Sequence, residues 1–398
     1  MNNTATPVEH QVDYILIGGG IAAASIAYWL APHGRVVILE RESQPGYHST
    51  GRSAALFMAS YGPPQVRALT NASREFLDNP PPGFCEHPLL TKRGVLLVAE
   101  KGREDQLQMT WNRISAEDPQ ARLLDATQAC QIMPALRLER VAGAVLEPGA
   151  ADMDVHALHQ GFLRGARRAG AQLVCGAEVT GLRRHDNLWS VEVAGQTYTA
   201  PVVVNAAGAW VDQVAALAGV MPIGSDALRR SAFVFALPPG VNAADWPVTI
   251  GIDAGWLVKP DAGMMMGSPI NADSVVPQDV QPEELDIALA VDRIEHMTEL
   301  LVRRPARSWA GLRCFVPDGS LVGGFDPEAA GFFWVAGQGG YGIQTAVAMG
   351  ETCAALVRGL PVPPAIAAWG VDAQALGAAR LRSNHLQSTS ESNTERAV

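Results

Sequence analysis

A glycine-rich turn near the N-terminus constrains the fold of this chain more than any other feature. Gly18 and Gly20 follow a short apolar run, 13–17, and open an apolar stretch, 21–30, whose first turn holds the small Ala23. The first glycine permits a tight turn, the second lets the backbone approach a pyrophosphate, and the small third residue lets the helix pack closely on the strand. The helix N-terminus then offers free N–H groups to phosphates. The spacing therefore predicts a strand–turn–helix unit that binds a dinucleotide.

A second apolar run, 35–39, ends in Glu40, twenty residues after Gly20. Short apolar strands of this kind belong to parallel sheets that are covered on both faces. A carboxylate at this position binds ribose hydroxyl groups and disfavours a 2′-phosphate, so we do not expect NADP. The glycine motif and Glu40 together do not distinguish FAD from NAD.

The strand–turn–helix pattern returns near the other end of the chain. Residues 332–336 are apolar, 337–340 read Gly-Gln-Gly-Gly, and a helix is expected over 343–358. Between the two ends, alternation over 228–267, punctuated by Pro and Gly, predicts an antiparallel sheet. Periodicity elsewhere predicts helices at 64–77, 104–114, 126–132, 152–169 and 282–301, and strands at 172–175, 180–184, 188–193, 196–200 and 202–205.

This order of elements predicts an α/β fold with a Rossmann-like nucleotide-binding domain and an inserted α+β domain built on an antiparallel sheet. We expect the nucleotide-binding domain to be discontinuous, with segments 11–90, 145–225 and 318–376. The substrate-binding domain would then comprise 91–144 and 226–317. Residues 380–398 are rich in Ser, Asn, Thr and Glu, a composition that favours a disordered tail.

Charge and cysteine content exclude several classes of function. The 398-residue chain has a formal net charge of −10, so its field would repel nucleic acid and anionic membranes. Its five cysteines form no C-x-x-C pair, which indicates reduced thiols rather than a disulfide framework or a zinc site. His156 and His159 lie three apart without a third ligand in view, so no metal site is expected. We see no signal peptide or membrane span and expect a cytoplasmic protein.

Three small-residue segments at strand ends carry a family resemblance: Gly46–Ala55, Val203–Trp210 and Val335–Gly342. They resemble the D-amino-acid oxidase, glycine oxidase and sarcosine oxidase family of flavoenzymes, and the similarity covers residues 13–376. Within that family the similarity is greatest to the bacterial FAD-dependent D-arginine dehydrogenases, most clearly over 44–55, 309–313 and 338–344. The resemblance implies non-covalent FAD, a two-domain fold, and oxidation of a C–N bond by hydride transfer to flavin N5. The resulting imine hydrolyses to a 2-oxo acid and ammonia.

The motifs and the resemblance together assign a set of cofactor-binding residues. Cys314 lies only three residues before Pro317, which does not match the spacing of the cysteine that tethers FAD in some sarcosine oxidases. The expected cofactor-binding residues are Gly18, Gly20, Ile21, Ala22, Glu40, Arg41, His48, Ser49, Thr50, Arg52, Ser53, Ala54, Ala55, Val179, Ala207, Gly208, Trp210, Gly311, Gly337, Gly339, Gly340, Tyr341, Gly342, Ile343 and Gln344.

Four residues match catalytic positions of the resembled family. Arg230 and Arg313 match its carboxylate-binding arginines, and a guanidinium fork suits a carboxylate bidentately. Tyr61 matches a lid-loop tyrosine, with a packed aromatic as the alternative interpretation. Gly340 matches a glycine whose carbonyl oxygen accepts from the substrate amine. No general base is evident, and a water molecule could take the ammonium proton.

Departures from the D-arginine dehydrogenases change the expected substrate. Val95 stands where those enzymes place the carboxylate that meets the substrate guanidinium, Leu56 replaces a histidine, Met58 a threonine and Leu257 a tyrosine, and Trp256 adds apolar bulk. A buried guanidinium without a partner would cost several kcal/mol, so we expect D-arginine to be a poor substrate. The alternative is that a nearby acid such as Glu100 takes the missing role.

The favoured hypothesis is an FAD-dependent dehydrogenase or oxidase of apolar or aromatic D-amino acids, with oxygen or a quinone as electron acceptor. Alternatives are oxidation of a secondary amine or N-substituted amino acid, oxidation of a 2-hydroxy acid, and a flavin-binding subunit without its own substrate. An arginine-bound carboxylate suits a 2-hydroxy acid as well as an amino acid, and the presence of both arginines argues against a subunit without its own substrate.

Overall fold

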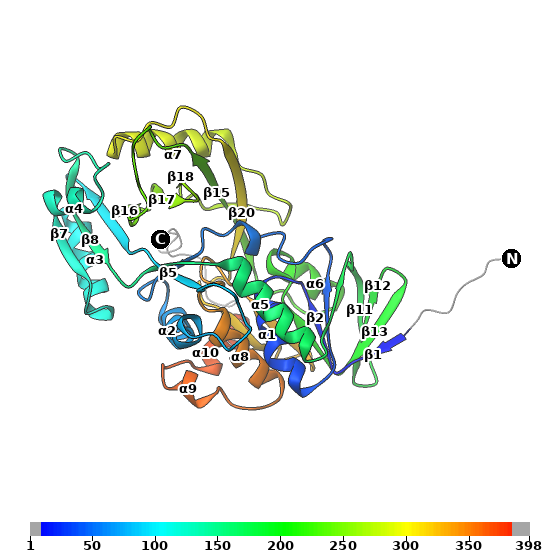
Figure 1. The fold of residues 1–398 in the computed structure, drawn as a ribbon. Coiled ribbons are helices and arrows are strands. Elements are labelled where there is room, and N and C mark those ends of the chain that lie inside the picture. The colour runs from blue at the N-terminus through cyan, green and yellow to red at the C-terminus, as the bar shows by residue number, and fades with distance from the viewer. Residues whose placement is uncertain (1–8, 384–398) are drawn as a thin grey trace.

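The computed structural model describes residues 9–383, and its central element is a six-stranded sheet (Figure 1). The strand order is β10-β3-β2-β14-β22-β21. Five strands are parallel, and β21 alone runs antiparallel to its neighbour. Their bounds are β2 (Tyr14–Ile17), β3 (Val36–Glu40), β10 (Gln172–Cys175), β14 (Val202–Asn205), β21 (Val322–Phe325) and β22 (Phe332–Ala336). This is the Rossmann-like sheet that the glycine motif predicts.

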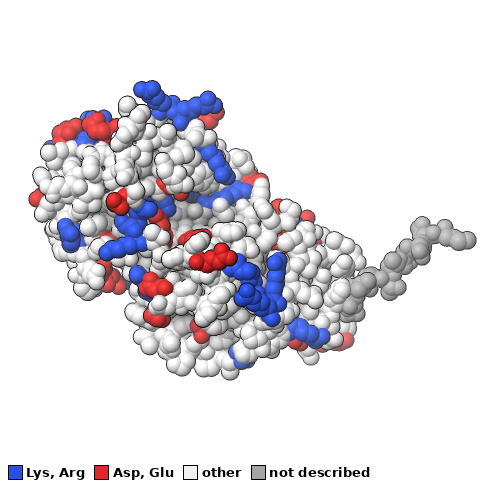
Figure 2. Space-filling model, viewed as in Figure 1, with Lys and Arg blue, Asp and Glu red and all other residues white. Residues whose placement is uncertain are grey.

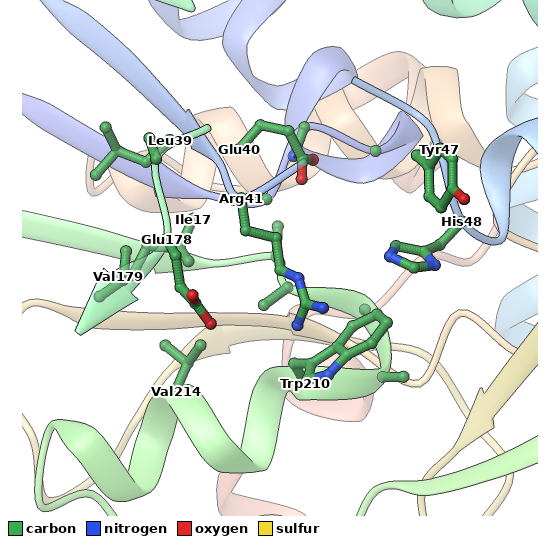
Figure 3. A pocket seen from close by; sticks show the side chains of 18 of the residues that line it. Ile17, Leu39, Glu40, Arg41, Tyr47, His48, Glu178, Val179, Trp210 and Val214 are labelled. Atoms are coloured by element: carbon green, nitrogen blue, oxygen red, sulfur yellow. The ribbon is translucent and has the colours of Figure 1, made fainter. Parts of the chain in front are cut away.

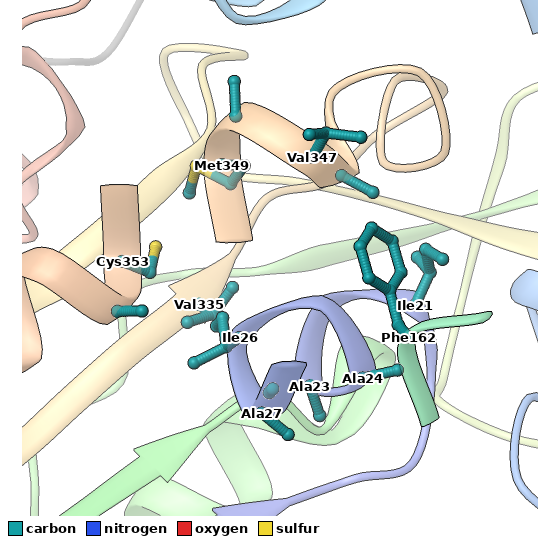
Figure 4. Close-up of a cluster of buried hydrophobic side chains, with 14 of the residues drawn as sticks. Ile21, Ala23, Ala24, Ile26, Ala27, Phe162, Val335, Val347, Met349 and Cys353 are labelled. Atoms are coloured by element: carbon teal, nitrogen blue, oxygen red, sulfur yellow. The ribbon is translucent and has the colours of Figure 1, made fainter. Parts of the chain in front are cut away.

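Side chains alternate between the two faces of this sheet and divide the core into two layers. Leu16 and Ile38 belong to the cluster formed with three helices, whereas Ile15 and Val37 belong to the cluster formed with a second, four-stranded sheet. Figure 4 shows part of the first cluster, with Ile26, Phe162 and Met349 labelled. The three helices are α1 (Ile21–Leu30), α5 (Val155–Arg168) and α8 (Ala346–Val357). The second sheet comprises β1 (Glu9–Gln11), β13 (Gln196–Ala200), β12 (Leu188–Val193) and β11 (Val179–His185), beside α6 (Val211–Leu217). Covering on both faces explains why the central strands carry continuous apolar runs.

Helix α1 approaches its neighbours closely because the contact positions are small. A Cβ atom at Gly350 of α8 would lie 2.6 Å from Oγ of Ser25, and one at Gly165 of α5 would lie 2.3 Å from the Tyr28 ring. Ala23 and Ala27 are fully buried at the same contacts. This packing holds the N-terminus of α1 firmly at the end of β2.

A nine-stranded sheet forms the other half of the molecule, with order β19-β15-β18-β17-β16-β6-β8-β7 and β20 paired to β15. Helix α7 covers it at the top of Figure 1, and α3 and α4 flank β7 and β8. The bounds are β6 (Val95–Glu100), β7 (Arg122–Asp125), β8 (Val141–Glu147), β15 (Asp226–Phe235), β16 (Val248–Gly251), β17 (Leu257–Asp261), β18 (Met264–Ser268), β19 (Asp273–Val275), β20 (Arg307–Phe315), α3 (Glu104–Glu117), α4 (Ala126–Ile132) and α7 (Glu284–Met297).

The antiparallel sheet predicted over 228–267 is confirmed, because β15, β18, β17 and β16 pair antiparallel in that order. One parallel pair, which the sequence did not predict, joins these strands to the rest of the sheet. β16 runs parallel to β6, with Val248 opposite Val95. The two strands are separated by more than a hundred residues, so no hairpin turn imposes an antiparallel direction on them. The division into two domains stays a proposal, in which the six- and nine-stranded sheets form the frames of the two units. The boundary at 144/145 falls within β8, whose residues 145–147 still pair with β6, so the substrate-binding unit would extend at least to Glu147.

Smaller elements complete the described chain. A three-stranded sheet has the order β4-β9-β5. The remaining bounds are β4 (Leu56–Phe57), β5 (Leu90–Lys92), β9 (Ala151–Met153), α2 (Pro64–Asp78), α9 (Pro364–Ala367), α10 (Ala373–Leu376), α11 (Ala379–Ser383), and the 3-10 turns η1 (Ala31–His33), η2 (Thr50–Arg52) and η3 (Gly208–Trp210). Within residues 9–383, no helix has the length and apolar character needed to cross a membrane.

Several predicted boundaries differ from the structure: the helix predicted over 282–301 ends at Met297, and the one predicted over 343–358 begins at Ala346. Residues 152–153 belong to β9 rather than to a helix, because Asp154 caps α5 by accepting the N–H of Ala157 at 2.8 Å. The predicted disordered tail starts too early: residues 380–383 continue α11, where Arg380 pairs with Asp318 at 2.7 Å. The rest of that tail, 384–398, lies outside the described residues.

Candidate active site

A cavity opens where β2, β3 and β14 end, beside the N-terminus of α1 (Figure 3). This is the edge at which parallel α/β sheets bind ligands. Eleven predicted cofactor-binding residues line it: Gly18, Gly20, Glu40, Arg41, His48, Ser49, Thr50, Val179, Ala207, Gly208 and Trp210. Sequence analysis missed further lining residues, including Ile17, Gly19, Leu39, Gly46, Tyr47, Ala177, Glu178, Val214 and Leu217.

The glycine turn fits a ligand that lies close to the backbone. Gly18 has a φ of +103°, and a Cβ atom there would lie 2.5 Å from the Ala206 carbonyl oxygen. Only glycine tolerates both conditions. Gly20 caps α1 in an extended conformation without any side-chain cap, although Thr50 Oγ1 accepts the next N–H, from Ile21, at 3.0 Å. The uncapped helix end and the bare turn form a cradle for phosphate oxygens.

Glu40 is held rigidly at the wall of this cavity. Its carboxylate accepts the N–H of Gly19 at 2.6 Å and that of Glu42 at 2.8 Å, and its side chain is nearly buried. Two charge-assisted hydrogen bonds fix the carboxylate while leaving lone pairs for further donors. The geometry therefore suits the ribose-binding role that its place in the sequence predicts.

Arg41, Trp210 and His48 form the opposite wall (Figure 3). The Arg41 guanidinium lies 4.4 Å from the Trp210 ring centroid, and the His48 ring lies 4.7 Å from the same indole. His48 also contacts the Glu42 carboxylate at 2.9 Å, and this hydrogen bond lowers the pKa of Glu42. The wall combines aromatic surface with cationic groups, which suits a ligand that carries both rings and phosphates.

Other predicted cofactor residues have structural roles. Arg52 points toward the inserted unit, where its guanidinium meets Asp279 at 2.5 Å and the Ala310 carbonyl oxygen at 3.0 Å, so its side chain does not reach the cavity. Gln344 is fully buried and binds the Met58 N–H at 3.1 Å. The remaining predicted positions, Ile21, Ala22, Ser53, Ala54, Ala55, Gly311, Gly337, Gly339, Gly340, Tyr341, Gly342 and Ile343, lie outside the lining of this cavity.

Buried His159 supports the glycine turn, a role that spacing on the helix did not reveal. Its Nε2 donates to the Gly19 carbonyl oxygen at 2.9 Å, and burial lowers the pKa of His159, which keeps the ring neutral. His156 on the same helix is exposed. Within the described part of the chain, no group of His, Cys, Asp and Glu could hold a metal ion.

A second cluster brings together all four residues predicted to be catalytic. In the β15–β20 pair, Arg230 lies opposite Gly311 and Leu228 opposite Arg313, so both arginines project from the same face of the sheet. Nη1 of Arg313 lies 3.5 Å from Oη of Tyr61. A Cβ atom at Gly340 would lie 2.8 Å from that oxygen and 3.0 Å from Nη1 of Arg313. Four separate segments of the chain therefore contribute to one cluster.

The two neighbouring arginines of β15 have opposite electrostatic surroundings. Arg229, on the other face, pairs with Glu283, Asp273 and Asp286; burial alone would lower its pKa, but these carboxylates raise it. Arg230 has no carboxylate partner among residues 9–383, and its buried Nε has no hydrogen bond there. Burial, and next the charge of Arg313, hold its pKa well below the ordinary value. A bound anion would stabilise the charges of these two arginines, so the pair is suited to bind one.

The strand that carries Arg313 also contacts the dinucleotide cavity. Oγ of Ser49 donates to the Leu312 carbonyl oxygen at 2.7 Å, and Ser49 lines that cavity. Cys314 is on the same strand but packs in an apolar cluster, where burial raises the pKa of its thiol to about 12. A thiol held in this state is a poor nucleophile for a covalent tether.

An apolar cluster adjoins Tyr61, which contacts Arg313. Leu56, Met58, Val95 and Leu257 belong to one hydrophobic cluster, and Tyr61 packs against it. Trp256 does not join them. It directly precedes Leu257, and because successive side chains of an extended chain point to opposite faces, Trp256 is buried on the other face, in the cluster under α7. The inclusion of Trp256 in the pocket is therefore wrong, whereas the other four positions do lie together.

The acid nearest to Val95 is Glu147, not Glu100. Glu100 pairs with His296 at 2.7 Å at the far end of β6, partly exposed to solvent. Glu147 lies directly opposite Val95 in the β6–β8 pair and is 1% exposed. Both of its oxygens accept hydrogen bonds from Ser60, and burial raises the pKa of this carboxyl. Local sequence does not reveal that Glu147 is buried, because a charged residue at the end of an apolar strand is usually exposed to solvent.

Comparison with known proteins agrees with this geometry. A model of the DAO family, described as FAD dependent oxidoreductase, matches residues 13–356. The chain belongs to this family. Glycine oxidase of Geobacillus kaustophilus is 25% identical over 88% of this chain and 94% of its own length. Human mitochondrial dimethylglycine dehydrogenase is 26% identical over 54% of this chain. The chain spans only about a quarter of the length of that longer relative.

A solved structure shows the same fold with its cofactor. The chain aligns with FAD-bound L-α-glycerophosphate oxidase of Mycoplasma pneumoniae at a TM-score of 0.79 and 17% identity, covering 89% of this chain and 97% of that one. The family match identifies the protein as an FAD-dependent oxidoreductase of the DAO type. The glycine turn, the uncapped helix α1 and Glu40 fit FAD, because they supply close backbone approach, free N–H groups and a ribose acceptor.

The surface of the protein gives no sign of a polyanion partner on the face shown in Figure 2, where basic and acidic side chains are interspersed. The expectation that nucleic acid is not a partner rests on the net charge of −10 and stays a prediction.

Proposed function

We propose that this protein oxidises the Cα–N bond of a small amino acid with an apolar or aromatic side chain, and that the D-enantiomer is the substrate. One observation carries the proposal: Arg230 and Arg313 lie side by side on one sheet face without a carboxylate partner in the described chain. A substrate carboxylate would offset both the desolvation of Arg230 and its repulsion by Arg313.

The residues around the arginine pair would then hold the substrate. The two guanidinium groups bind the carboxylate, and Oη of Tyr61 adds a hydrogen-bonding group beside Arg313. Gly340 lies against Tyr61 and Arg313, and in this proposal its carbonyl oxygen accepts from the substrate amine. Bound FAD supplies the two-electron oxidant. A water molecule takes the ammonium proton, and water then hydrolyses the imine to a 2-oxo acid and ammonia.

The adjoining cluster supports an apolar side chain. Leu56, Met58, Val95 and Leu257 offer no charge to a substrate guanidinium, and the carboxylate of Glu147 is already engaged by Ser60. D-Arginine could bind only by breaking that engagement, so we predict that it is a poor substrate. The second candidate is an N-substituted amino acid, whose carboxylate would bind the same two arginines. This class is favoured by the similarity to dimethylglycine dehydrogenase, which is named for an N-substituted amino acid.

Substrate profiling with two electron acceptors tests the proposal. The purified holoenzyme is mixed with apolar, aromatic and basic amino acids of both configurations, with sarcosine, and with a 2-hydroxy acid. Turnover is followed with oxygen and with an artificial quinone. We expect the highest kcat/KM with an apolar or aromatic D-amino acid. Stronger turnover of D-arginine would refute the pocket argument, and a preference for sarcosine would favour the second candidate.

A further inference from the structure

Charged side chains from three elements fasten the short segment 59–62, which carries Tyr61. Oγ of Ser60 donates to Oε2 of Glu147 at 2.5 Å, and its N–H donates to Oε1 at 3.3 Å. Nη1 of Arg113 donates to the Ser60 carbonyl oxygen at 3.2 Å. Nη1 of Arg67 donates to the Gly62 carbonyl oxygen at 2.7 Å. The backbone on both sides of Tyr61 is therefore held by bonds that the catalytic cluster itself does not supply.

Glu147 contributes the most buried of these anchors. It ends β8, opposite Val95 and on the sheet face that adjoins the apolar cluster. No salt bridge joins it to Arg113 in the described chain, although Glu147 lies near enough to favour the charge of that guanidinium. A buried carboxylate is costly, and a well-packed apolar residue usually serves stability as well or better. Stability alone therefore explains this residue poorly.

The geometry of the segment links Glu147 to the proposed carboxylate site. Ser60 and Tyr61 are adjacent, so a shift of Ser60 moves the tyrosine. Tyr61 in turn lies 3.5 Å from Arg313 and packs against the ring of Tyr341 at 5.2 Å. Gly62 has a φ of +90°, and a Cβ atom there would lie 2.7 Å from Val66, so the chain turns sharply after the tyrosine. The anchor, the tyrosine and the arginine form one continuous chain of contacts.

We propose that Glu147 is a positioning residue, which holds Tyr61 against Arg313 by accepting hydrogen bonds from the hydroxyl and the N–H of Ser60. This inference rests on the proposed function, because it takes Arg313 and Tyr61 as the substrate-carboxylate site. Tyr61 is then held in place before substrate arrives, so its contribution to carboxylate binding carries little ordering cost.

The test measures binding of benzoate, an aromatic carboxylate probe, to the FAD-loaded protein through the perturbation of flavin absorption, together with KM and kcat for the best amino acid. The variants are Glu147→Ala and the milder Ser60→Ala, each also made in a Tyr61→Ala background. Glu100→Gln is the matched control, since Glu100 lies on the neighbouring strand but pairs with His296 at the surface. FAD content and melting temperature show which variants remain folded.

We expect Glu147→Ala to weaken benzoate binding and to raise KM by about tenfold, and Ser60→Ala to act in the same direction by roughly threefold. Both effects should fall below about twofold when Tyr61 is already alanine, because contributions made through a shared residue are not additive. Glu100→Gln should match the parent protein. A purely structural role would lower the melting temperature without this dependence on Tyr61.

Three results would overturn the proposal. One is unchanged benzoate affinity in both folded variants, Glu147→Ala and Ser60→Ala. Another is an effect of Glu147→Ala that persists in full in the Tyr61→Ala background. The third is a loss confined to basic amino acids, which would make Glu147 a partner of the substrate side chain. Failure of the proposed function is distinguishable, since the parent protein would then neither bind benzoate nor turn over any amino acid.

Discussion

Replacing Arg230 with methionine should make the substrate-free protein more stable and its substrate binding weaker. Arg230 is half-buried, its buried Nε has no hydrogen bond in the described chain, and the charge of Arg313 disfavours its own charge. Removing a buried polar group that lacks a partner is worth about 1–3 kcal/mol. Methionine fills a similar volume without charge. For a cooperative chain of 398 residues this gain corresponds to a melting temperature higher by roughly 1–4 °C.

The same replacement removes half of the proposed carboxylate clamp. Hydrogen bonds to a charged group contribute about 1.5–3 kcal/mol, so benzoate affinity should fall by roughly 10- to 150-fold. Thermal unfolding of the FAD-loaded protein, with and without benzoate, measures both effects on one sample. Benzoate should raise the melting temperature of the parent protein and have little effect on the variant.

Arg229→Met is the control, because Arg229 is adjacent in sequence but faces the other side of β15 and pairs with Asp273, Glu283 and Asp286. It should lower the melting temperature, since it leaves carboxylates without their partner, and it should leave benzoate affinity almost unchanged. The reasoning is refuted if Arg230→Met destabilises the protein as Arg229→Met does, or if it binds benzoate as tightly as the parent.

Three further perturbations give separate tests. Gly340→Ala places a methyl group 2.8 Å from Oη of Tyr61, so kcat/KM should fall by about tenfold or more while FAD content stays the same, as steady-state assays would measure. Glu40→Gln should weaken FAD binding by about tenfold in a titration of the apoprotein, because the ribose loses a charged acceptor. Burial alone would raise the pKa of Asp326, but bonds from Trp334 and Arg382 lower it below 3.8. Its ionised form therefore stabilises the fold above that pH, and this stabilisation is lost as the pH falls through the lowered pKa. Asp326→Asn should lower the free energy of unfolding near neutral pH. In unfolding measured as a function of pH, the variant should also lose less stability than the parent protein as the solution is acidified.

Much of the cofactor half of the molecule could be predicted from local sequence. The strand–turn–helix around Gly18 and the position of Glu40 depend on spacing within a few tens of residues, and parallel strands with apolar runs have a characteristic pattern. The glycine requirement at Gly18 has a further cause that spacing does not show. The Ala206 carbonyl, nearly two hundred residues away, passes within 2.5 Å of the place where a Cβ atom would be.

The features that could not be predicted all depend on contacts between distant segments. The parallel pairing of β16 with β6 has no local signal, because a long connection joins the two strands. Trp256 was assigned to the wrong face because it precedes β17, where alternation could not be anchored without the strand boundary. The sequence around Glu147 and His159 indicates nothing unusual about either residue. Only the fold shows that Glu147 accepts a hydrogen bond from Ser60 and that His159 donates one to the Gly19 carbonyl oxygen.

Anaerobic flavin reduction tests the central claim most directly, because it needs no electron acceptor and reports only on what the active site can oxidise. The FAD-loaded protein is mixed without oxygen with an apolar D-amino acid, with its L-enantiomer, and with the corresponding amine that lacks the carboxylate. Reduction bleaches the yellow flavin absorption. We predict rapid bleaching by the D-amino acid and very slow bleaching by the amine, since only the former engages Arg230 and Arg313. Equal bleaching by the carboxylate-free amine would contradict the proposed role of the arginine pair.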